Sequence, residues 1–320
     1  MPLSFDKPLK DLKNYKGTNP RPKDFDSFWD KSIREMRSLD PDVELKKADF
    51  ESPFGEYFHL YFTGTGNARV HAKFARPRKA KKGHPAIVRF HGYSGDAGDW
   101  VTLNSYLAMG YSIAALDCRG QGGLSQDNSD VRGWTLRGQI IRGLEDAPEK
   151  LYFRNVYLDT ALMTRIVMDM PEVDEKRVGA MGGSQGGGLT VACIGLEPRI
   201  KLAAPVFPFL TDYKRVWEMD QAANAYEELA VFFRKKDPLH NKEDEYFTKL
   251  GYIDVQFLCP RIKTKVLWFT GLMDKVCPPS TQFAAYNKIK SPKKMVIYPD
   301  FGHEGLPGQE DTTFQFMRGL

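Results

Sequence analysis

Between Arg177 and Leu196 the chain reads Arg-Val-Gly-Ala-Met-Gly-Gly-Ser-Gln-Gly-Gly-Gly-Leu-Thr-Val-Ala-Cys-Ile-Gly-Leu. The first residues are typical of a buried strand, and the small and apolar residues at the end are typical of a helix. Between them, Gly182-Gly-Ser184-Gln-Gly186 fits G-x-S-x-G, the nucleophile elbow of a strand-to-helix turn. Residues 178–196 carry no charge, but their seven glycines make them a poor membrane span.

The glycines on both sides of Ser184 have a physical reason. In so tight a turn the serine backbone is strained, and a nearby Cβ would collide with the adjacent strand and helix. The structural alternatives are a glycine-rich helix seam and a phosphate loop. However, no lysine follows the last glycine and no G-x-G-x-x-G opens the helix. Ser184 is therefore the predicted nucleophile.

Short apolar runs alternate with helical stretches around this motif. The alternation predicts a mostly parallel sheet with helices on both faces, preceded by an antiparallel, half-exposed start. Residues 151–170 repeat apolar side chains every four positions up to Pro171, as a crossover helix would. The predicted strands are 43–50, 57–62, 69–74, 86–90, 111–116, 177–181, 201–206, 266–270 and 295–298.

The domain organisation follows from where the alternation of strand-like and helical segments stops. A length of 320 residues suggests about two domains, but the pattern over 1–320 favours one α/β domain with two additions. Residues 1–50 form an amino-terminal arm with an amphipathic helix from Phe25 to Met36. Residues 211–260 are polar and helix-favouring, and we expect a helical insertion over the end of the sheet where such folds place their pockets.

An activated serine needs a base and an acid to orient that base, in the chain order Ser, Asp or Glu, His. His303 follows the strand-like run 295–298, whereas His240 lies in the polar insertion and is interpreted as a surface residue. Asp274 follows the run 266–270 on a loop. Asp300 competes with it, but is only three residues from His303 and has little room to approach Nδ1 in line.

The oxyanion that develops during acyl transfer needs backbone N–H donors. One comes from the residue after the nucleophile, here Gln185, and the second from the loop after an early strand, here Tyr93. His91 has no partner at metal-ligand spacing and is interpreted as support for that loop. His59, His71 and His84 are interpreted as ordinary strand or loop residues. This chemistry calls for no metal and no cofactor.

Charge and cysteine usage exclude several classes. The chain has 46 Lys+Arg against 41 Asp+Glu, and the excess lies in one turn-like run, which predicts a solvated loop and no nucleic-acid partner. The first residues lack a basic and then apolar leader, so we expect a cytoplasmic protein with no membrane partner. The four cysteines are far apart and are predicted to be free thiols. The basic run comprises Arg76, Arg78, Lys79, Lys81 and Lys82.

With these motifs in place, the chain resembles carbohydrate esterase family 7, the acetyl xylan esterases and cephalosporin C deacetylases of the α/β-hydrolase superfamily. The resemblance spans essentially the whole chain. It rests on Arg119-Gly120-Gln121, Gly182-Gly183-Ser184-Gln185-Gly186-Gly187 and His303-Glu304, supported by His91-Gly92-Tyr93 and Asp274-Lys-Val-Cys277-Pro-Pro-Ser-Thr281. We interpret Arg119 as a structural tie between loops near the site.

The resemblance implies a serine esterase that acts on small acetylated substrates, namely acetylated xylo-oligosaccharides and cephalosporin C. It also implies a triad of Ser184, Asp274 and His303, an oxyanion hole of Tyr93 and Gln185, and Val276 near the acyl side of the pocket. A homohexamer built as a dimer of trimers is implied as well. Two alternatives stay open: a serine peptidase of the prolyl oligopeptidase type, and a hydrolase-fold scaffold without activity.

Overall fold

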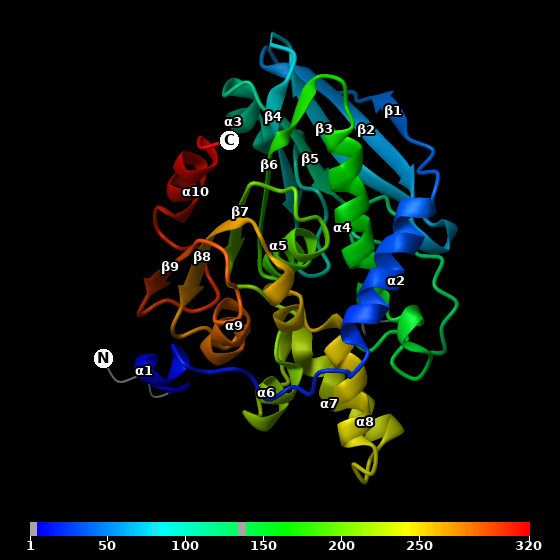
Figure 1. Cartoon of the computed structure of the whole chain (residues 1–320), viewed down its shortest axis with the longest axis vertical. Helices are drawn as coiled ribbons and strands as arrows, with labels where there is room; N and C mark the ends of the chain where they lie inside the picture. Colours follow the sequence, from blue (N-terminus) through cyan, green and yellow to red (C-terminus); the bar gives the residue numbers. More distant parts are fainter. Residues whose placement is uncertain (1–4, 80, 134–138) are drawn as a thin grey trace.

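The computed structural model describes residues 5–79, 81–133 and 139–320, and its centre is one nine-stranded sheet. The strand order is β1-β2-β3-β5-β4-β6-β7-β8-β9 (Figure 1). The strands are β1 (Glu44–Lys47), β2 (Gly55–Thr63), β3 (Arg69–Pro77), β4 (His84–Phe90), β5 (Ser112–Leu116), β6 (Val173–Gly183), β7 (Leu202–Val206), β8 (Lys265–Gly271) and β9 (Lys293–Tyr298).

The sheet changes from antiparallel to parallel along its width. β1, β2, β3 and β5 pair antiparallel in that order, and every pairing from β5 through β4 to β9 is parallel. Phe90 of β4 lies opposite Gly182 of β6, and Gly183 lies opposite Val206 of β7. The carboxyl ends of the central strands therefore meet at one edge, where pockets of such sheets form.

Helices cover both faces of the sheet (Figure 1). The core on one face joins α4 and α5 with α2 outside them, whereas α3 and α10 pack on the other. The mostly parallel sheet with helices on both faces is thus confirmed. The helices are α1 (Leu9–Leu12), α2 (Phe25–Ser38), α3 (Asn104–Ala108), α4 (Tyr152–Met168), α5 (Gln185–Leu196), α6 (Tyr213–Glu218), α7 (Glu227–Lys236), α8 (Glu243–Leu250), α9 (Pro279–Tyr286) and α10 (Gln309–Met317).

The antiparallel start differs from its prediction. β3 was expected to be half exposed, but His71 and Ala75 are as fully buried as the apolar side chains on its other face. The reason is position, because β3 pairs with both β2 and β5 and so lies inside the sheet. β1, at the edge, has all four residues exposed.

The basic run is only partly a loop. Arg76 belongs to β3 and pairs with Glu56 and Glu172 at 2.9 and 3.2 Å, whereas Lys79, Lys81 and Lys82 are exposed. Ala80 within this run lies outside the described residues, as do residues 1–4, where a leader would begin. Within the described ranges, no helix has both the length and the apolar character to cross a membrane.

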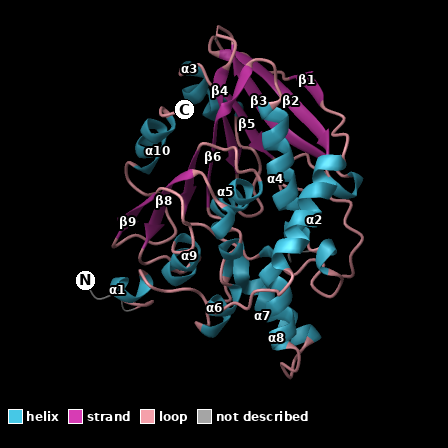
Figure 2. Ribbon diagram, in the orientation of Figure 1, coloured by secondary structure: helices cyan, strands magenta, loops and turns pink. Residues whose placement is uncertain are grey.

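Residues 211–260 are helical, and α6, α7 and α8 gather beyond one end of the sheet (Figure 2). The amino-terminal arm is fastened to them through Asp212, which is fully buried. Its carboxylate accepts hydrogen bonds from the Tyr15 hydroxyl and from the N–H groups of Thr18 and Asn19, each at 2.9 Å. The arm is therefore held by specific hydrogen bonds to a buried charge.

A second buried carboxyl group, Asp254, contacts the backbone of Asp212 at this junction. Its Oδ2 accepts the backbone N–H of Asp212 at 3.0 Å and the side-chain amide of Gln256 at 2.8 Å. Burial, with the negative charge of Asp212 adding to it, raises the pKa of Asp254 to about 7. The arm junction thus contains a carboxyl group that is costly to ionise.

This junction predicts a pH dependence of stability. The pKa of Asp254 is raised on folding, so the stability contributed by its neutral form is complete below about pH 4 and is lost as the pH rises through about 7. Asp254→Asn removes that loss. We expect the melting temperature of the wild type to fall relative to the variant between pH 5 and pH 8. The corresponding difference in the free energy of unfolding should be at most a few kcal/mol, since a shift of one pKa unit is about 1.4 kcal/mol.

Differential scanning calorimetry across this pH range measures the effect. Asp130→Asn is the matched control because that carboxylate is fully exposed, and its melting temperature should follow the wild type. Parallel curves for the wild type and Asp254→Asn would contradict the prediction.

Candidate active site

Ser184 stands on the turn between β6 and α5, where the sequence predicts a nucleophile elbow. Its backbone has φ 58° and ψ −119°, an uncommon conformation for a residue with a side chain. The Ser184 N–H donates to Val206 O, and its carbonyl accepts from the N–H groups of Gly188 and Phe209, all at 3.0 Å. Hydrogen bonds to β7 and to the segment after it therefore hold the strained residue in place.

Two of the surrounding glycines are required by space. A Cβ at Gly186 would lie 2.1 Å from the carbonyl oxygen of Phe90, and one at Gly182 would lie 2.6 Å from the carbonyl oxygen of Gly186. Both neighbours are backbone atoms, which cannot rotate away. The close approach of β4, β6 and α5 at this point is therefore possible only with glycine.

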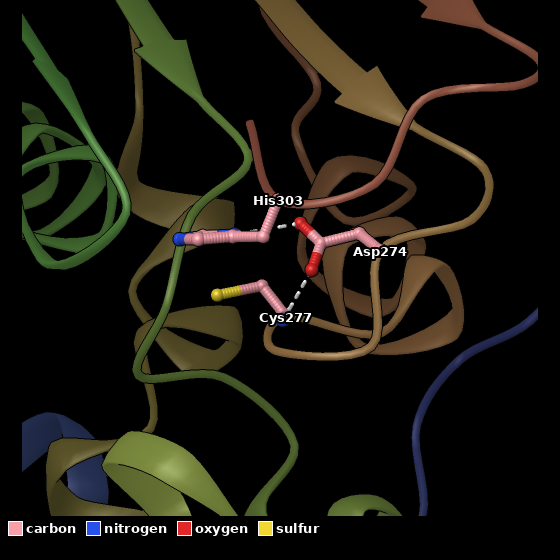
Figure 3. Close-up of side chains that lie close together, drawn as sticks. All are labelled: Asp274, Cys277 and His303. Carbon is pink, nitrogen blue, oxygen red and sulfur yellow. Dashed lines mark hydrogen bonds and ion pairs between the residues drawn. The ribbon is translucent and has the colours of Figure 1, made fainter. Parts of the chain in front are cut away.

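His303 and Asp274 complete a chain of hydrogen bonds that starts at Ser184. His303 Nε2 lies 3.0 Å from Ser184 Oγ. On the other side of the ring, His303 Nδ1 lies 2.8 Å from Asp274 Oδ2, and Figure 3 shows this second contact. The two residues come from the loops after β9 and β8, as the sequence predicts. The ring of Phe207 packs against the His303 ring at 4.4 Å between centroids.

Asp274 is fully buried and is satisfied on both oxygens. Its Oδ1 accepts the backbone N–H groups of Val276 and Cys277 at 2.9 and 2.8 Å, which leaves Oδ2 directed at His303. A carboxylate held in this way fixes the orientation of the imidazole and can stabilise its protonated form.

The alternatives considered for these roles lie elsewhere. It is Asp274 that His303 Nδ1 contacts, whereas Asp300 is exposed. His240 lies between α7 and α8 on the surface, where Nδ1 contacts Glu243 at 3.0 Å. The structure thus joins the three residues that the sequence selects in one chain of hydrogen bonds.

Cys277 lies beside this chain, and Figure 3 shows its thiol on the same side as the His303 ring. Candidate ligand atoms of Asp274, Cys277 and His303 lie within 4.8 Å of one another, a spacing that could hold a metal ion. Burial raises the pKa of the Cys277 thiol, and the Asp274 charge adds to the rise. Because metal ligands must be deprotonated and the Asp274 oxygens already accept three hydrogen bonds, this group suits proton transfer better than metal binding.

One candidate oxyanion residue lies in the elbow and the other on the loop after β4. Gln185 is the first residue of α5, where a backbone N–H has no acceptor within the helix. Tyr93 lies on the loop after β4; its ring packs edge-on against Phe209 at 5.7 Å, and its hydroxyl donates to Glu228 at 2.6 Å. His91 accepts the backbone N–H of Cys118 at 3.0 Å, a contact that fits its interpretation as loop support.

A pair of side-chain amides links the elbow to this loop and was not foreseen. Gln185 Nε2 and Gln121 Oε1 are 3.0 Å apart, as are Gln121 Nε2 and Gln185 Oε1. Gln121 Oε1 also accepts the N–H of Ser94 at 2.9 Å. The position of Gln121 directly after Arg119-Gly120 was visible in the sequence, but only the fold shows which loops the amide joins.

Arg119 is the structural tie that the sequence suggests. It is almost fully buried, and its guanidinium donates to both oxygens of Asp159 at 2.5 and 2.7 Å and to the carbonyl of Thr65 at 2.7 Å. Its planar donor fork therefore joins α4 to the segment between β2 and β3. Gln121, two residues further along, contacts Gln185 of the elbow.

His59 lies in β2 and His71 in β3, which agrees with their interpretation as strand residues, but both also take part in polar contacts that the sequence does not predict. His71 is fully buried, and its ring contacts Asp117 at 2.6 Å on one side and His59 at 2.9 Å on the other. Asp117 also accepts the backbone N–H groups of Ala97 and Leu124. These histidines therefore belong to a buried polar network that holds the loops after β4 and β5, formed by residues too distant in sequence for a local pattern to reveal.

The chain is similar to known proteins in both sequence and structure. The family model for acetyl xylan esterase (AXE1) matches residues 1–320. The structure is similar to that of acetyl xylan esterase 1 from Thermoanaerobacterium sp. JW/SL YS485, with a TM-score of 0.96, 55% identity and 98% coverage of both chains. It is also similar to an acetyl xylan esterase from Paenibacillus sp. R4, with a TM-score of 0.93, 35% identity, and coverage of 98% of this chain and 100% of that one.

More distant relatives bear on the fold. Acetyl esterase Axe7A from Xylanibacter ruminicola is 27% identical over 295 residues, which are 87% of this chain and 62% of that protein. The chain thus spans less than two thirds of that curated relative. Acylaminoacyl peptidase from Pyrococcus horikoshii, at 18% identity and a TM-score of 0.56, shows likeness of fold alone, over 88% of this chain and 42% of that one. By its full-length match and these structures, the chain belongs to the acetyl xylan esterase family, carboxylic ester hydrolases with the α/β-hydrolase fold.

Proposed function

We propose that this protein is a serine esterase that removes acetyl groups from acetylated xylo-oligosaccharides and from small esters of the cephalosporin C type. The observation that carries the proposal is the continuous hydrogen-bond chain from Ser184 through His303 to the buried Asp274. The family to which the chain belongs supports the acetyl ester as the substrate class.

In the proposed reaction, His303 Nε2 takes the proton of Ser184 Oγ as that oxygen attacks the acetyl carbonyl. The N–H groups of Tyr93 and Gln185 stabilise the negative charge on the former carbonyl oxygen. The C–O bond to the sugar breaks, and His303 returns the proton to the leaving alcohol. Water then attacks the acetyl-serine by the same steps, which yields acetate and the free enzyme.

The surroundings of the serine support this assignment. An unassisted hydroxyl is a weak nucleophile at neutral pH, so a base within hydrogen-bond distance is required. The turn lifts Ser184 out of the sheet while Gly182 and Gly186 allow β4 and α5 to approach from both sides. The thiol of Cys277, kept protonated by burial, does not compete as a nucleophile.

The resemblance to carbohydrate esterase family 7 supports three further parts of the proposal. We propose that residues 1–320 form one α/β-hydrolase domain with the insertion 211–260 over the active site. We also propose that six copies assemble as a dimer of trimers, and light scattering on the purified protein would give the mass of six chains. A monomer would contradict the proposed assembly without affecting the proposed esterase.

The proposed nucleophile can be tested by substitution. Ser184→Ala removes the attacking oxygen, and the rate of p-nitrophenyl acetate hydrolysis should fall by about 10⁴ to 10⁶ in kcat, because the triad residues act as a unit. A fluorophosphonate probe should label the wild type at Ser184 and leave the variant unlabelled. Ser38→Ala, an exposed serine at the end of α2, is the control and should keep full activity.

Near-full activity of a folded Ser184→Ala protein would refute the assignment. Absence of labelling in the wild type would favour the inactive scaffold, and faster turnover of aminoacyl amides than of acetyl esters would favour the peptidase.

The size of the acyl group is expected to govern the rate. With Val276 on the acyl side of the pocket, acetyl esters should be cleaved fastest and propionyl esters more slowly, because one methylene changes discrimination by only about 1 to 3 kcal/mol. Rates for p-nitrophenyl esters from acetyl to octanoyl measure this order. Val276→Ala should increase the butyryl-to-acetyl ratio of kcat/KM. Faster cleavage of longer chains by the wild type would contradict the prediction.

A further inference from the structure

Glu228, on the first turn of α7, is a buried carboxyl group inside the insertion. Glu228 is 5% exposed, and the ring of Tyr93, whose hydroxyl contacts it, packs against Phe209. Oε1 accepts the hydroxyl of Tyr93 at 2.6 Å, and Oε2 accepts the backbone N–H groups of Ile140 and Ile141 at 3.0 and 3.3 Å. Three neutral donors therefore compensate for a carboxyl group that is costly to bury.

The partner of Glu228 carries one of the two proposed oxyanion donors. Tyr93 lies in the turn from Gly92 to Gly95, and this turn is held from other directions as well. The Ser94 N–H donates to Gln121 Oε1 at 2.9 Å, and the Gly92 carbonyl accepts from Gln185 Nε2 at 3.3 Å. These bonds tie the turn to the loop after β5 and to the elbow, whereas the contact with Glu228 ties Tyr93 itself to the insertion.

We infer that Glu228 is a positioning residue for the oxyanion hole, which it serves by fixing the side chain of Tyr93 and with it the direction of the Tyr93 backbone N–H. This inference rests on the proposed esterase function. Glu228 touches neither the substrate nor the nucleophile in this role; it acts through Tyr93. The insertion therefore does more than cover the site, because it supplies the far anchor of a catalytic donor.

The expected size of the effect follows from the role of the donor. Removing one oxyanion-hole donor lowers kcat by about 10² to 10³ in enzymes of this type. A donor that is present but less well oriented should cost part of that factor. Because the negative charge exists only in the transition state, the loss should appear in kcat and leave KM nearly unchanged.

Glutamine is a suitable conservative replacement at this position. Burial raises the pKa of Glu228 to about 7, so a neutral side chain of the same shape is close to one of its own protonation states. The amide oxygen of Glu228→Gln can accept the two backbone N–H groups, and its NH₂ can donate to the Tyr93 hydroxyl. Glu228→Ala removes all three hydrogen bonds, and Tyr93→Phe removes only the hydroxyl while keeping the backbone N–H.

The experiment measures kcat and KM for p-nitrophenyl acetate in these three variants and in the double variant Glu228→Ala/Tyr93→Phe. Active-site titration with a fluorophosphonate corrects each value for correctly folded enzyme. We expect Glu228→Ala to lower kcat about 10- to 100-fold with KM within about threefold of the wild type, and Glu228→Gln to stay within about fivefold. On a free-energy scale, the loss of kcat in the double variant should be much smaller than the sum of the losses in the two single variants. The reason is that both substitutions break the same contact between Tyr93 and Glu228.

Glu227→Ala is the matched control, since Glu227 is the exposed neighbour of Glu228 on the same turn. It should retain the wild-type kcat. If Glu228→Ala fails to fold, Tyr93→Phe and Glu228→Gln carry the test. Hydrogen–deuterium exchange of peptides covering residues 91–95 adds a readout independent of turnover, and exchange there should be faster in Tyr93→Phe than in the wild type.

Unchanged kcat in both Glu228→Ala and Tyr93→Phe would overturn the inference, as would a rise in KM with kcat preserved. Additive losses in the double variant would also overturn it. Failure of the proposed function looks different, because wild type and Glu227→Ala would then lack esterase turnover and probe labelling altogether. The exchange measurement would still report in that case whether Glu228 anchors the turn.

Discussion

A serine held at a positive φ between a strand and a helix is the constraint on which the rest of the site depends. The conformation is unfavourable for any residue with a side chain, and it persists only because its surroundings determine it. The carbonyl of Val206 accepts a hydrogen bond from the Ser184 N–H. The backbones of β4 and α5 also approach so closely that Gly186 has no room for a Cβ. Hydrogen bonds to the sheet and close backbone contacts thus keep Ser184 in this conformation.

Features that depend on a short stretch of sequence could be predicted well. The elbow, the strand ends that carry Asp274 and His303, and the parallel sheet with helices on both faces all follow from local pattern and chain order. The physical reason is that a turn, a buried strand and a loop at a strand end each have a local signature. Even there, β3 was misjudged, because its exposure depends on which strand becomes its second neighbour.

Polar contacts between distant segments could not be predicted in the same way. The amide pair of Gln121 and Gln185 joins residues 64 positions apart, and Tyr93 and Glu228 are 135 apart. The sequence around one residue of such a pair carries no sign of the partner that it will contact. Both types of contact surround the loop after β4, so the least predictable part of the molecule is the part that places the proposed oxyanion donors.

The amino-terminal arm has a consequence for how the molecule is made. Asp6 accepts the backbone N–H of Ser280 at 2.7 Å and pairs with Arg215 at 3.0 Å, so the first described residues close onto partners synthesised more than two hundred positions later. Domains fold broadly from the amino terminus as the ribosome proceeds, but this arm must wait for α6 and α9 to emerge. His303 follows Ser184 by 119 positions and contacts Asp274, which also lies later in the chain than the serine. The contacts of the arm and those of the site therefore share one requirement, because both can form only after segments far along the chain have been synthesised.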